Sequence, residues 1–337
     1  MSKLRVGLAG YGGWTREAYV PAIQRAGSAD IVAAAAVSLA TREQIGVELG
    51  SKVRVYEDFG TLLKDPDLDV VFIALPDSQH EAAILAAIES GLPFFYEPPV
   101  AESLDRIRPV LGRLLSTPQI TQADMELRFI PVVNRAARLV AEGAIGEPRT
   151  ASIRMRASWK PAPGAQISLM HSLVAWYVDA LDRVIGRPAE RVLVQDGRGT
   201  PGRMQGYTLV QLDYGRIWGT FDASIASVCS EPETQIEVCG EEGDLVEDLF
   251  TGELRMRTKA EGQWRSELVP ALKPHVGWPG MHECVADFLD AVANNGSTGA
   301  DAVALAQAHL VGLAGEASLD SGTWAQVERV EDLALGS

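Results

Sequence analysis

The stretch Leu4–Gly13, LRVGLAGYGG, decides the fold because it joins an apolar run of strand length to a glycine-rich turn. The segment that follows, near YVPAIQRAG (19–27), has the spacing of a helix. Gly10 permits a tight turn between strand and helix, and Gly12 lets the backbone approach a pyrophosphate at the helix N-terminus. The stretch therefore predicts a dinucleotide-binding turn, with a glycine-rich turn that binds nothing as the alternative.

Strand-like and helix-like segments continue to alternate after this turn. In order they are IVAAAAVS (31–38), TREQIGVELG (41–50), LDVVFIALP (68–76), HEAAILAAIESG (80–91) and PFFYE (93–97). Apolar strands separated by helices indicate a parallel sheet that is covered on both faces. Residues 1–122 are therefore predicted to form a Rossmann domain of the α/β class.

The pattern changes after Gln122, where strands with alternating apolar and polar residues predominate. They are RTASIRMRAS (149–158), RVLVQD (191–196), YTLVQLDY (207–214), RIWGTFDASIAS (216–227), TQIEVCG (234–240) and GELRMRTK (252–259). This alternation predicts a large, mostly antiparallel sheet. Residues 123–337 are thus expected to form an α+β domain for substrate binding and oligomerisation, with 172–186 as one helix.

Composition excludes several classes of function. The formal net charge of −15 repels phosphate backbones, so we expect no nucleic-acid partner. Three scattered cysteines predict neither a disulfide framework nor a metal site. No apolar run approaches the roughly 20 residues of a membrane helix, and the N-terminus has no signal core, so we expect a cytoplasmic protein without a membrane partner.

The cofactor-binding residues expected from the turn are Gly10, Tyr11, Gly12, Gly13, Trp14 and Thr15, where Thr15 replaces the usual third glycine or alanine. The second strand ends at Ser38, where an acidic residue would bind the ribose hydroxyls of NAD. Ser38, followed by Thr41 and Arg42, better suits a 2′-phosphate. The sequence thus favours NADP, with NAD as the alternative and Arg42 as a solvated helix residue in that case.

Four further segments together resemble the glucose–fructose oxidoreductase/inositol dehydrogenase (Gfo/Idh/MocA) family. They are VGLAGYGG with VPAIQRAG, VVFIALPDSQHEAAILAAIESGLPFFYEPP, LRFIPVVNRAARLVAEGAIGEPRTASI and QIEVCGEEGDL. The resemblance covers nearly the whole chain. It implies a Rossmann domain, a second domain with a large sheet, and NAD(P) chemistry on a sugar, polyol or related small polar compound. It also places Leu75, Pro76, His80, Glu97 and Pro98 at the cofactor, with a structural role for His80 as the alternative.

The chain departs from the family's pattern where protons are handled. The family's Glu-Lys-Pro tripeptide reads Glu97-Pro98-Pro99 here. Its helix motif D-x-G-x-H-x-x-D, anchored on Asp179, places Trp176 at the histidine and Ser172 at the first aspartate. Proline and tryptophan cannot transfer protons, so the acid–base group that hydride transfer needs must come from elsewhere.

Two residues are candidates for that group. His171 lies about one helical turn before Trp176. A shifted alignment would place His171 at the histidine of the family motif, but it would require about five extra residues before Gly186, more than one helical turn. Lys160 lies in WKPAPGAQ, a loop in which substrate contacts are expected. A structural histidine and a solvated lysine are the alternatives. Arg128, Trp176 and Asp179 are the expected substrate residues, with an interdomain ion pair as the alternative for Arg128.

These observations favour an NAD(P)-dependent oxidoreductase with altered acid–base residues. The alternative is a non-catalytic dinucleotide-binding paralogue that serves as a subunit or sensor, and a non-redox elimination with a tightly held cofactor is a third possibility. Apolar residues on both faces of the second sheet, among them Tyr207, Trp218 and Phe221, predict a covered face and hence a homodimer or homotetramer.

Overall fold

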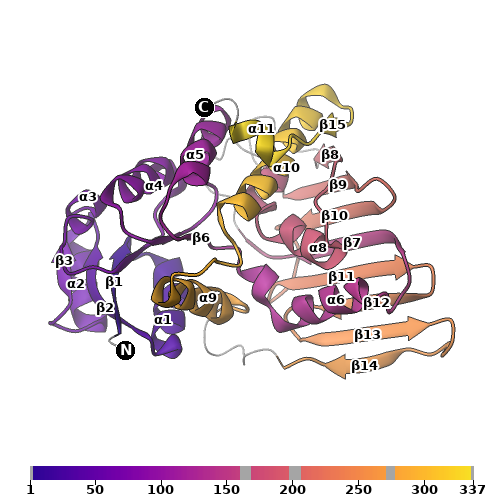
Figure 1. Ribbon diagram of the computed structural model, residues 1–337, viewed down its shortest axis with the longest axis horizontal. Helices are drawn as coiled ribbons and strands as arrows, with labels where there is room; N and C mark the ends of the chain where they lie inside the picture. The colour runs from indigo at the N-terminus through magenta and orange to yellow at the C-terminus, as the bar shows by residue number, and fades with distance from the viewer. Residues whose placement is uncertain (1–2, 160–167, 197–205, 271–277, 335–337) are drawn as a thin grey trace. The chain divides into compact units, whose positions relative to one another are not determined.

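The N-terminal strand, β1 (Leu4–Ala9), lies near the middle of a six-stranded parallel sheet in a computed structural model that describes residues 3–159, 168–196, 206–270 and 278–334 (Figure 1). The other strands are β2 (Ala29–Ala35), β3 (Arg54–Tyr56), β4 (Val70–Ile73), β5 (Phe94–Tyr96) and β6 (Thr121–Ala123). Their order is β3-β2-β1-β4-β5-β6. The order reverses at β1, and ligands of such sheets bind beyond the carboxyl ends of the strands at that reversal.

The connecting helices follow the sequence signals. They are η1 (Thr15–Tyr19), α1 (Val20–Ala26), α2 (Leu39–Glu48), α3 (Phe59–Leu62), α4 (Asp77–Ser90) and α5 (Leu104–Ser116). Helices α1 and α4 end at Gly27 and Gly91, whose φ angles of +70° and +79° suit a glycine C-cap. The Rossmann domain predicted from the sequence is therefore confirmed as a fold.

The chain divides into two compact units, and the division differs from the predicted boundary. Unit 1 comprises Met1–Met125, Lys273–Leu305 and Leu333–Ser337, and unit 2 comprises Glu126–Leu272 and Ala306–Asp332. The sequence prediction places all of 123–337 in the second domain. The reason for the difference is α9 (Met281–Asn294), whose Phe288 packs against Phe72 and Phe95 with ring centroids 5.5 and 5.7 Å apart.

Unit 2 is built on a nine-stranded sheet. Its strands are β7 (Pro148–Arg156), β8 (Arg191–Asp196), β9 (Tyr207–Asp213), β10 (Trp218–Ser224), β11 (Glu233–Gly240), β12 (Gly243–Asp248), β13 (Glu253–Thr258), β14 (Arg265–Leu268) and β15 (Ala325–Gln326). They are ordered β14-β13-β12-β11-β7-β10-β9-β8-β15. The pairing of β10 with β7 is parallel and the others are antiparallel, as the mostly antiparallel prediction requires.

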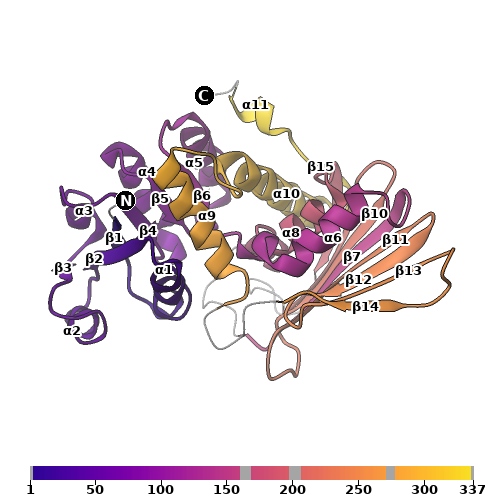
Figure 2. The same ribbon diagram turned by 60° about the horizontal axis from the view of Figure 1, so that its bottom comes forward.

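Helices lie on one face of this sheet (Figure 2). They are η2 (Glu126–Phe129), α6 (Pro131–Ala141), α7 (Leu169–Leu173), α8 (Tyr177–Ile185) and the unit 2 part of α10 (Ala302–Ser321). The short helix α11 (Val330–Ala334) follows β15. The predicted single helix over 172–186 is wrong, because a turn between Leu173 and Tyr177 separates α7 from α8. Most of this run is buried, including Val174 and Ala175 in the turn. One straight helix buries only a stripe of its surface, so the break allows more of the run to be buried.

The opposite face of the sheet is open in the chain as described. Tyr207 and Trp218 are each 55% exposed on that face, whereas Phe221 is buried under the helices. The expectation of apolar groups on both faces therefore holds, with Phe221 on the inner one.

Helix α10 is the one helix in the described part of the chain that is long and apolar enough to cross a membrane. In its most apolar window, 61% is buried inside the fold. Core helices that are mostly buried pass the same test, so the length and composition of α10 are weak evidence for a membrane span.

Candidate functional site

The turn after β1 has a backbone that only glycine fits at its first position. Gly10 has a φ of +102°, and a Cβ atom there would lie 2.0 Å from the carbonyl oxygen of Ala74. At Gly12, by contrast, a Cβ atom would meet nothing within 4 Å. Gly10 is thus required by the fold, whereas Gly12 leaves free space. A buried Thr15, whose hydroxyl donates to the Gly10 carbonyl at 3.3 Å, holds the turn onto the helix that follows.

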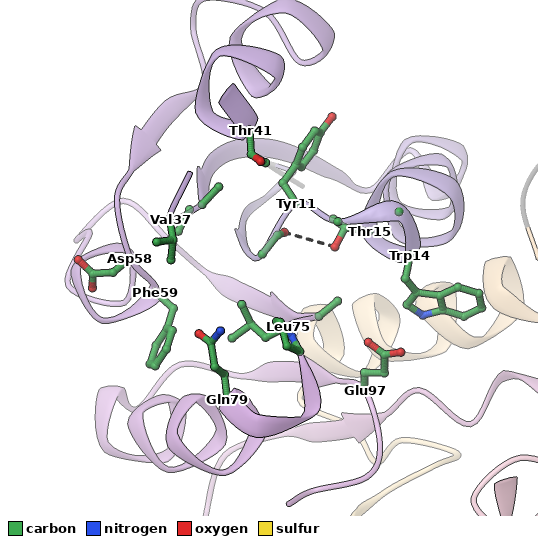
Figure 3. Close-up of a pocket in the computed structure, with 17 residues that line it drawn as sticks. Tyr11, Trp14, Thr15, Val37, Thr41, Asp58, Phe59, Leu75, Gln79 and Glu97 are labelled. Atoms are coloured by element: carbon green, nitrogen blue, oxygen red, sulfur yellow. Dashed lines mark hydrogen bonds between the residues drawn. The ribbon is translucent and has the colours of Figure 1, made fainter. Parts of the chain in front are cut away.

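A cavity of about 420 Å³ opens beside this turn (Figure 3). Its size lies within the roughly 300–1,000 Å³ of small-molecule sites. Its lining residues come from the turn and from the carboxyl ends of the strands: Gly10, Tyr11, Gly12, Gly13, Trp14, Thr15, Ala35, Ala36, Val37, Thr41, Asp58, Phe59, Ala74, Leu75, Pro76, Gln79 and Glu97. The structure thus brings together nine of the residues that the sequence nominated for cofactor binding.

The pocket has two ends (Figure 3). Val37, Asp58 and Phe59 lie at one end, beyond β2 and β3, and Trp14 and Glu97 lie at the other. In doubly wound sheets the adenosine ribose is bound near the end of the second strand. The Trp14–Glu97 end is therefore the one toward which the other half of a dinucleotide would extend.

At the β2 end, Ser38 and Arg42 do not line the cavity. The Ser38 side chain caps α2 by accepting from the Thr41 amide at 3.0 Å. The Arg42 guanidinium donates to the carbonyl oxygens of Ala36 and Val37 at 3.1 and 2.7 Å. Both residues therefore shape the end of β2, while Thr41 and Val37 face the space.

Beyond β4 and β5, Leu75 and Pro76 line the cavity, whereas His80 and Pro98 are buried behind it. The two ring nitrogens of His80 lie 2.7 Å from the carbonyl oxygens of Leu75 and Pro99. This position ties the end of β4 to the segment after β5. Of the two roles left open for His80, the geometry favours the structural one.

Glu97 is the acidic residue at the Trp14 end. Burial raises the pKa of its carboxyl group well above the usual range, and the charges of Asp124 and Asp77 raise it further. Asp124 accepts hydrogen bonds at one oxygen, Oδ2, from the Trp14 indole at 2.8 Å and from the Tyr19 hydroxyl at 2.9 Å. A hydrogen-bonded network of three residues, Trp14, Tyr19 and Asp124, thus stands next to Glu97.

The predicted substrate residues of unit 2 contact one another. Arg128 Nε lies 3.0 Å from Asp179 Oδ2, and both side chains are largely buried. Burial raises the pKa of Asp179 to about 6, an effect that Arg128 and Arg183 oppose. Trp176 is half-buried at the N-cap of α8, and its indole nitrogen has no hydrogen-bond partner among the described residues. The Arg128 pair lies within unit 2, so it is not the interdomain pair that the sequence left open.

The structure places the predicted acid–base residue His171 in the core of unit 2. Its side chain is 1% exposed, and its ring packs against Gly312 of α10 and lies 5.6 Å from the His309 ring. Burial lowers the pKa of His171 to about 4. Substrate contact by this side chain is therefore disfavoured, because helices enclose it. Lys160 lies outside the described residues.

Sequence reasoning missed several residues of the pocket and its surroundings. Asp58, Phe59 and Gln79 line the cavity, and Tyr19 and Asp124 form the network beside Glu97. A signal for Asp124 was present: it directly follows the short strand β6, just as Glu97 follows β5. Equivalent positions after neighbouring parallel strands lie close together.

Within 3–159, 168–196, 206–270 and 278–334, no three His, Cys, Asp or Glu side chains gather in a way that could hold a metal ion.

Comparison with known proteins agrees with both domains. Residues 4–122 match the oxidoreductase family with an NAD-binding Rossmann fold, and residues 133–246 match the GFO/IDH/MocA C-terminal domain. Inositol 2-dehydrogenase 4 of Saccharopolyspora erythraea is 27% identical over 98% of this chain and 97% of its own length. The scyllo-inositol 2-dehydrogenase (NAD(+)) of Bacillus subtilis is 35% identical over 32% of this chain and 31% of its own length.

Solved structures share the fold. Levoglucosan dehydrogenase in complex with NADH and L-sorbose has a TM-score of 0.84 at 18% identity, and the match covers 98% of this chain and 100% of that one. An oxidoreductase from Agrobacterium radiobacter, in complex with NAD+, L-tartaric acid and magnesium, has a TM-score of 0.80 at 16% identity, covering 97% and 99%. With both of its domains matched and its glycine turn opening on a cavity, the chain belongs to the Gfo/Idh/MocA family of oxidoreductases with an NAD-binding Rossmann fold.

Proposed function

We propose that this chain binds a nicotinamide dinucleotide in the glycine-turn pocket and acts as an oxidoreductase on a sugar, a polyol or a related small polar compound. The observation that carries the proposal is the free space at Gly12, beside a cavity bounded by the carboxyl ends of β1, β2 and β4. A pyrophosphate fits there because no side chain occupies the space next to the start of the helix. When bound, the nicotinamide would supply the hydride chemistry, and the side chains would supply binding and the proton.

The substrate class rests on the relatives. Two of them are named as inositol 2-dehydrogenases, and one structural neighbour was solved with L-sorbose. These compounds share neighbouring hydroxyl groups that a polar site can hold. Arg128, Asp179 and Trp176 remain our candidates for unit 2's contribution, and Lys160 stays a candidate for proton transfer.

The proposed preference for NADP is a finer point. It is supported by Ser38, the N-cap of α2 shortly after β2, where a carboxylate would repel a 2′-phosphate, and by Arg42 one turn further on. It is opposed by Glu57, which lies 3.5 Å from Arg42, and by Asp58 in the pocket wall. NAD is therefore kept as the alternative, and titration decides between them.

Titration calorimetry with NADH and NADPH tests the binding step, and absorbance of the reduced nicotinamide over a panel of polyols and sugars tests turnover. Saturable binding followed by turnover of one panel member is the expected result. Failure of both nucleotides to bind would refute the whole proposal. Variants Lys160→Ala and His171→Ala, made singly, report whether either residue handles the proton.

A non-catalytic dinucleotide-binding subunit or sensor is the second candidate. It is favoured by Pro98 and Trp176, which stand where the family resemblance implies a lysine and a histidine. Tight binding of cofactor without turnover of any panel member would support it, and brisk turnover would exclude it.

We also propose a homodimer or homotetramer that forms through the open face of the nine-stranded sheet. Tyr207, Leu209 and Trp218 are all exposed on adjacent strands β9 and β10. Large apolar side chains that are exposed along one face of a sheet mark interaction surfaces. Light scattering at micromolar concentration should give an oligomer, and Trp218→Glu should dissociate it. A monomeric parent protein contradicts the proposal.

A further inference from the structure

The acid–base group of the proposed reaction can be sought among the side chains that line the pocket. Its titratable side chains, within the described part of the chain, are Tyr11, Asp58 and Glu97. The Tyr11 hydroxyl donates to Glu48 at 2.9 Å, and burial raises the pKa of Tyr11 to about 12. The Asp58 carboxylate caps α3 through the Thr61 amide and hydroxyl, and it lies at the opposite end. Glu97 is the remaining group.

Glu97 also lies at the end of the pocket where the reactive half of a dinucleotide is expected. The pyrophosphate position at Gly12 and the adenosine position beyond β2 leave the β5 side for the reactive half of a dinucleotide. Figure 3 shows the Glu97 carboxyl group directed from the end of β5 into the space below Trp14. Tyr96, its neighbour in sequence, is fully buried in β5 and does not line the pocket.

The surroundings of Glu97 suit a group that exchanges a proton. Tyr96 and Ala123 are paired in the register of β5 and β6, and the Asp124 amide donates to the Tyr96 carbonyl at 2.8 Å. Glu97 and Asp124 therefore follow directly after two paired residues, at the same level of neighbouring strands. Negative charge at Asp124, and at Asp77 on α4, works with burial to keep the proton on Glu97.

Asp124 is itself fixed in place. Its Oδ2 atom accepts from Trp14 Nε1 and from Tyr19 Oη, both on the helical segment after the glycine turn. Tyr19 is fully buried, and Trp14 packs edge-on against Trp278 with centroids 5.6 Å apart. Hydrogen bonds thus connect Asp124, which lies beside Glu97, to the helical segment that follows the glycine turn.

We propose that Glu97 is the catalytic acid–base residue at the reactive end of the pocket, that it takes over from the lysine that Pro98 replaces, and that Asp124 is its positioning residue. The inference rests on the proposed function. In the oxidation direction, the substrate carbon gives its hydrogen and two electrons to the cofactor. The hydroxyl O–H bond breaks, its proton forms a new O–H bond on the ionised Glu97 carboxylate, and a C=O bond results. Reduction returns the same proton from Glu97 to the carbonyl oxygen.

A readout other than turnover tests this directly. An oxidised nicotinamide ring is positively charged, so its binding next to Glu97 lowers the pKa of that carboxyl group and releases a proton. We expect calorimetry over a series of pH values, in buffers of different protonation enthalpy, to show proton release on binding of the oxidised cofactor and none on binding of the reduced one.

Three variants complete the experiment. Glu97→Gln should abolish the proton release while reduced cofactor still binds, and Asp124→Asn should move the release to lower pH. Glu89→Gln, an exposed acid on α4 of the same unit, is the matched control and should behave as the parent. Where a substrate is found, Glu97→Gln should lower kcat about 10²–10⁴-fold.

The outcomes separate the two proposals. If neither cofactor form binds, the proposed function fails and this inference falls with it. If both forms bind and the parent releases no proton, or Glu97→Gln releases as much as the parent, only the role of Glu97 is overturned. Should Glu97→Gln fail to fold, the infrared carbonyl band of protonated carboxylic acid in the parent decides: part of the band should disappear when the oxidised cofactor binds, while the part from buried Glu247 stays. A band that the oxidised cofactor leaves unchanged overturns the role of Glu97.

Discussion

The two units bury ionisable side chains in different ways. In unit 1, Glu97 stands at the wall of a cavity, beside a network that connects it to the glycine turn. In unit 2, Glu247 and His171 are fully enclosed, and Arg128 and Asp179 form a largely buried ion pair. The pKa values of Glu97, Glu247 and His171 are all shifted by burial, yet only Glu97 has space for a ligand next to it.

A shifted pKa therefore marks a functional site only when the group also reaches a cavity. Glu247 illustrates the other case. On β12 it lies between Ile236 of β11 and Leu254 of β13, and neither carboxylate oxygen has a hydrogen-bond partner among the described residues. Changes around the cavity should therefore alter binding and leave stability alone, and changes in the core of unit 2 should do the reverse.

The largest expected effect is at the turn. Gly12→Val should abolish saturable cofactor binding, because the side chain fills the space where a Cβ atom now meets nothing. The melting temperature should stay within a few degrees of the parent's, as measured by circular dichroism. Gly46→Val on α2, which also points into open space, is the control and should bind normally. Retained binding in Gly12→Val would mean that the space at Gly12 is not where the pyrophosphate binds.

Glu247→Gln should change stability and leave cofactor binding as it is. Burial raises the pKa of Glu247 to about 8 from an ordinary 4.5, so the folded protein keeps a proton that the unfolded chain loses. Stability of the parent should therefore fall as pH rises between those two values, with a total effect on the order of 2 kcal/mol after local relaxation. Urea unfolding across that range measures it.

The variant should flatten this pH dependence. Glu237→Gln, an exposed acid on β11, should leave it unchanged. Parallel curves for the parent and Glu247→Gln would mean that the Glu247 carboxyl group is not held protonated.

His171→Leu should act with the opposite sign. Burial lowers the pKa of His171 to about 4 from 6.5, so the unfolded chain binds a proton that the folded protein excludes. Stability of the parent should be full above the unfolded value and should fall with decreasing pH through the folded value, by on the order of 1.5 kcal/mol. Acid unfolding followed by tryptophan fluorescence measures it. Some dependence should persist in the variant, since burial also lowers the pKa of His309.

Activity of His171→Leu gives a further distinction. If the variant loses turnover but keeps its stability profile, then His171 is the catalytic group and the reasoning from burial is wrong.

The smallest effect is expected at Arg42, which lies behind the β2 end of the pocket. Arg42→Ala should weaken NADPH binding about fivefold, close to 1 kcal/mol for an exposed ion pair, and leave NADH binding unchanged. Arg25→Ala, an exposed residue on α1, is the control for loss of charge. Equal losses for both nucleotides, or a parent that prefers NADH, would contradict the proposed preference for NADP.

Much of the first unit could be predicted from sequence because its signals are local. The apolar run before Gly10 and the glycine C-caps at Gly27 and Gly91 each depend on a few neighbouring residues. What could not be predicted depends on distant partners. The assignment of α9 to unit 1 depends on aromatic contacts across the chain, and the break before Tyr177 depends on burial from several sides.

The candidate site shows the same division. The turn residues from Gly10 to Thr15 line the cavity as the motif predicts. The role of Asp124 escaped notice because it needs the register of β5 with β6 and the reach of Tyr19 over more than a hundred residues of sequence. The buried position of His171 could not be predicted, because proximity to Trp176 in sequence does not determine which way a helix faces.

The composition of unit 1 from separated segments has a consequence for synthesis. While a ribosome produces this chain, the first 125 residues emerge long before α9, which covers Phe72 and Phe95. Until residues 281–294 have been synthesised, the helix that packs against Phe72 and Phe95 is missing and this aromatic surface is uncovered. A nascent chain in this state carries an apolar patch of the sort that chaperones bind and that aggregates in their absence. A fragment ending at Met125 should accordingly need α9, supplied as a separate peptide, to become soluble.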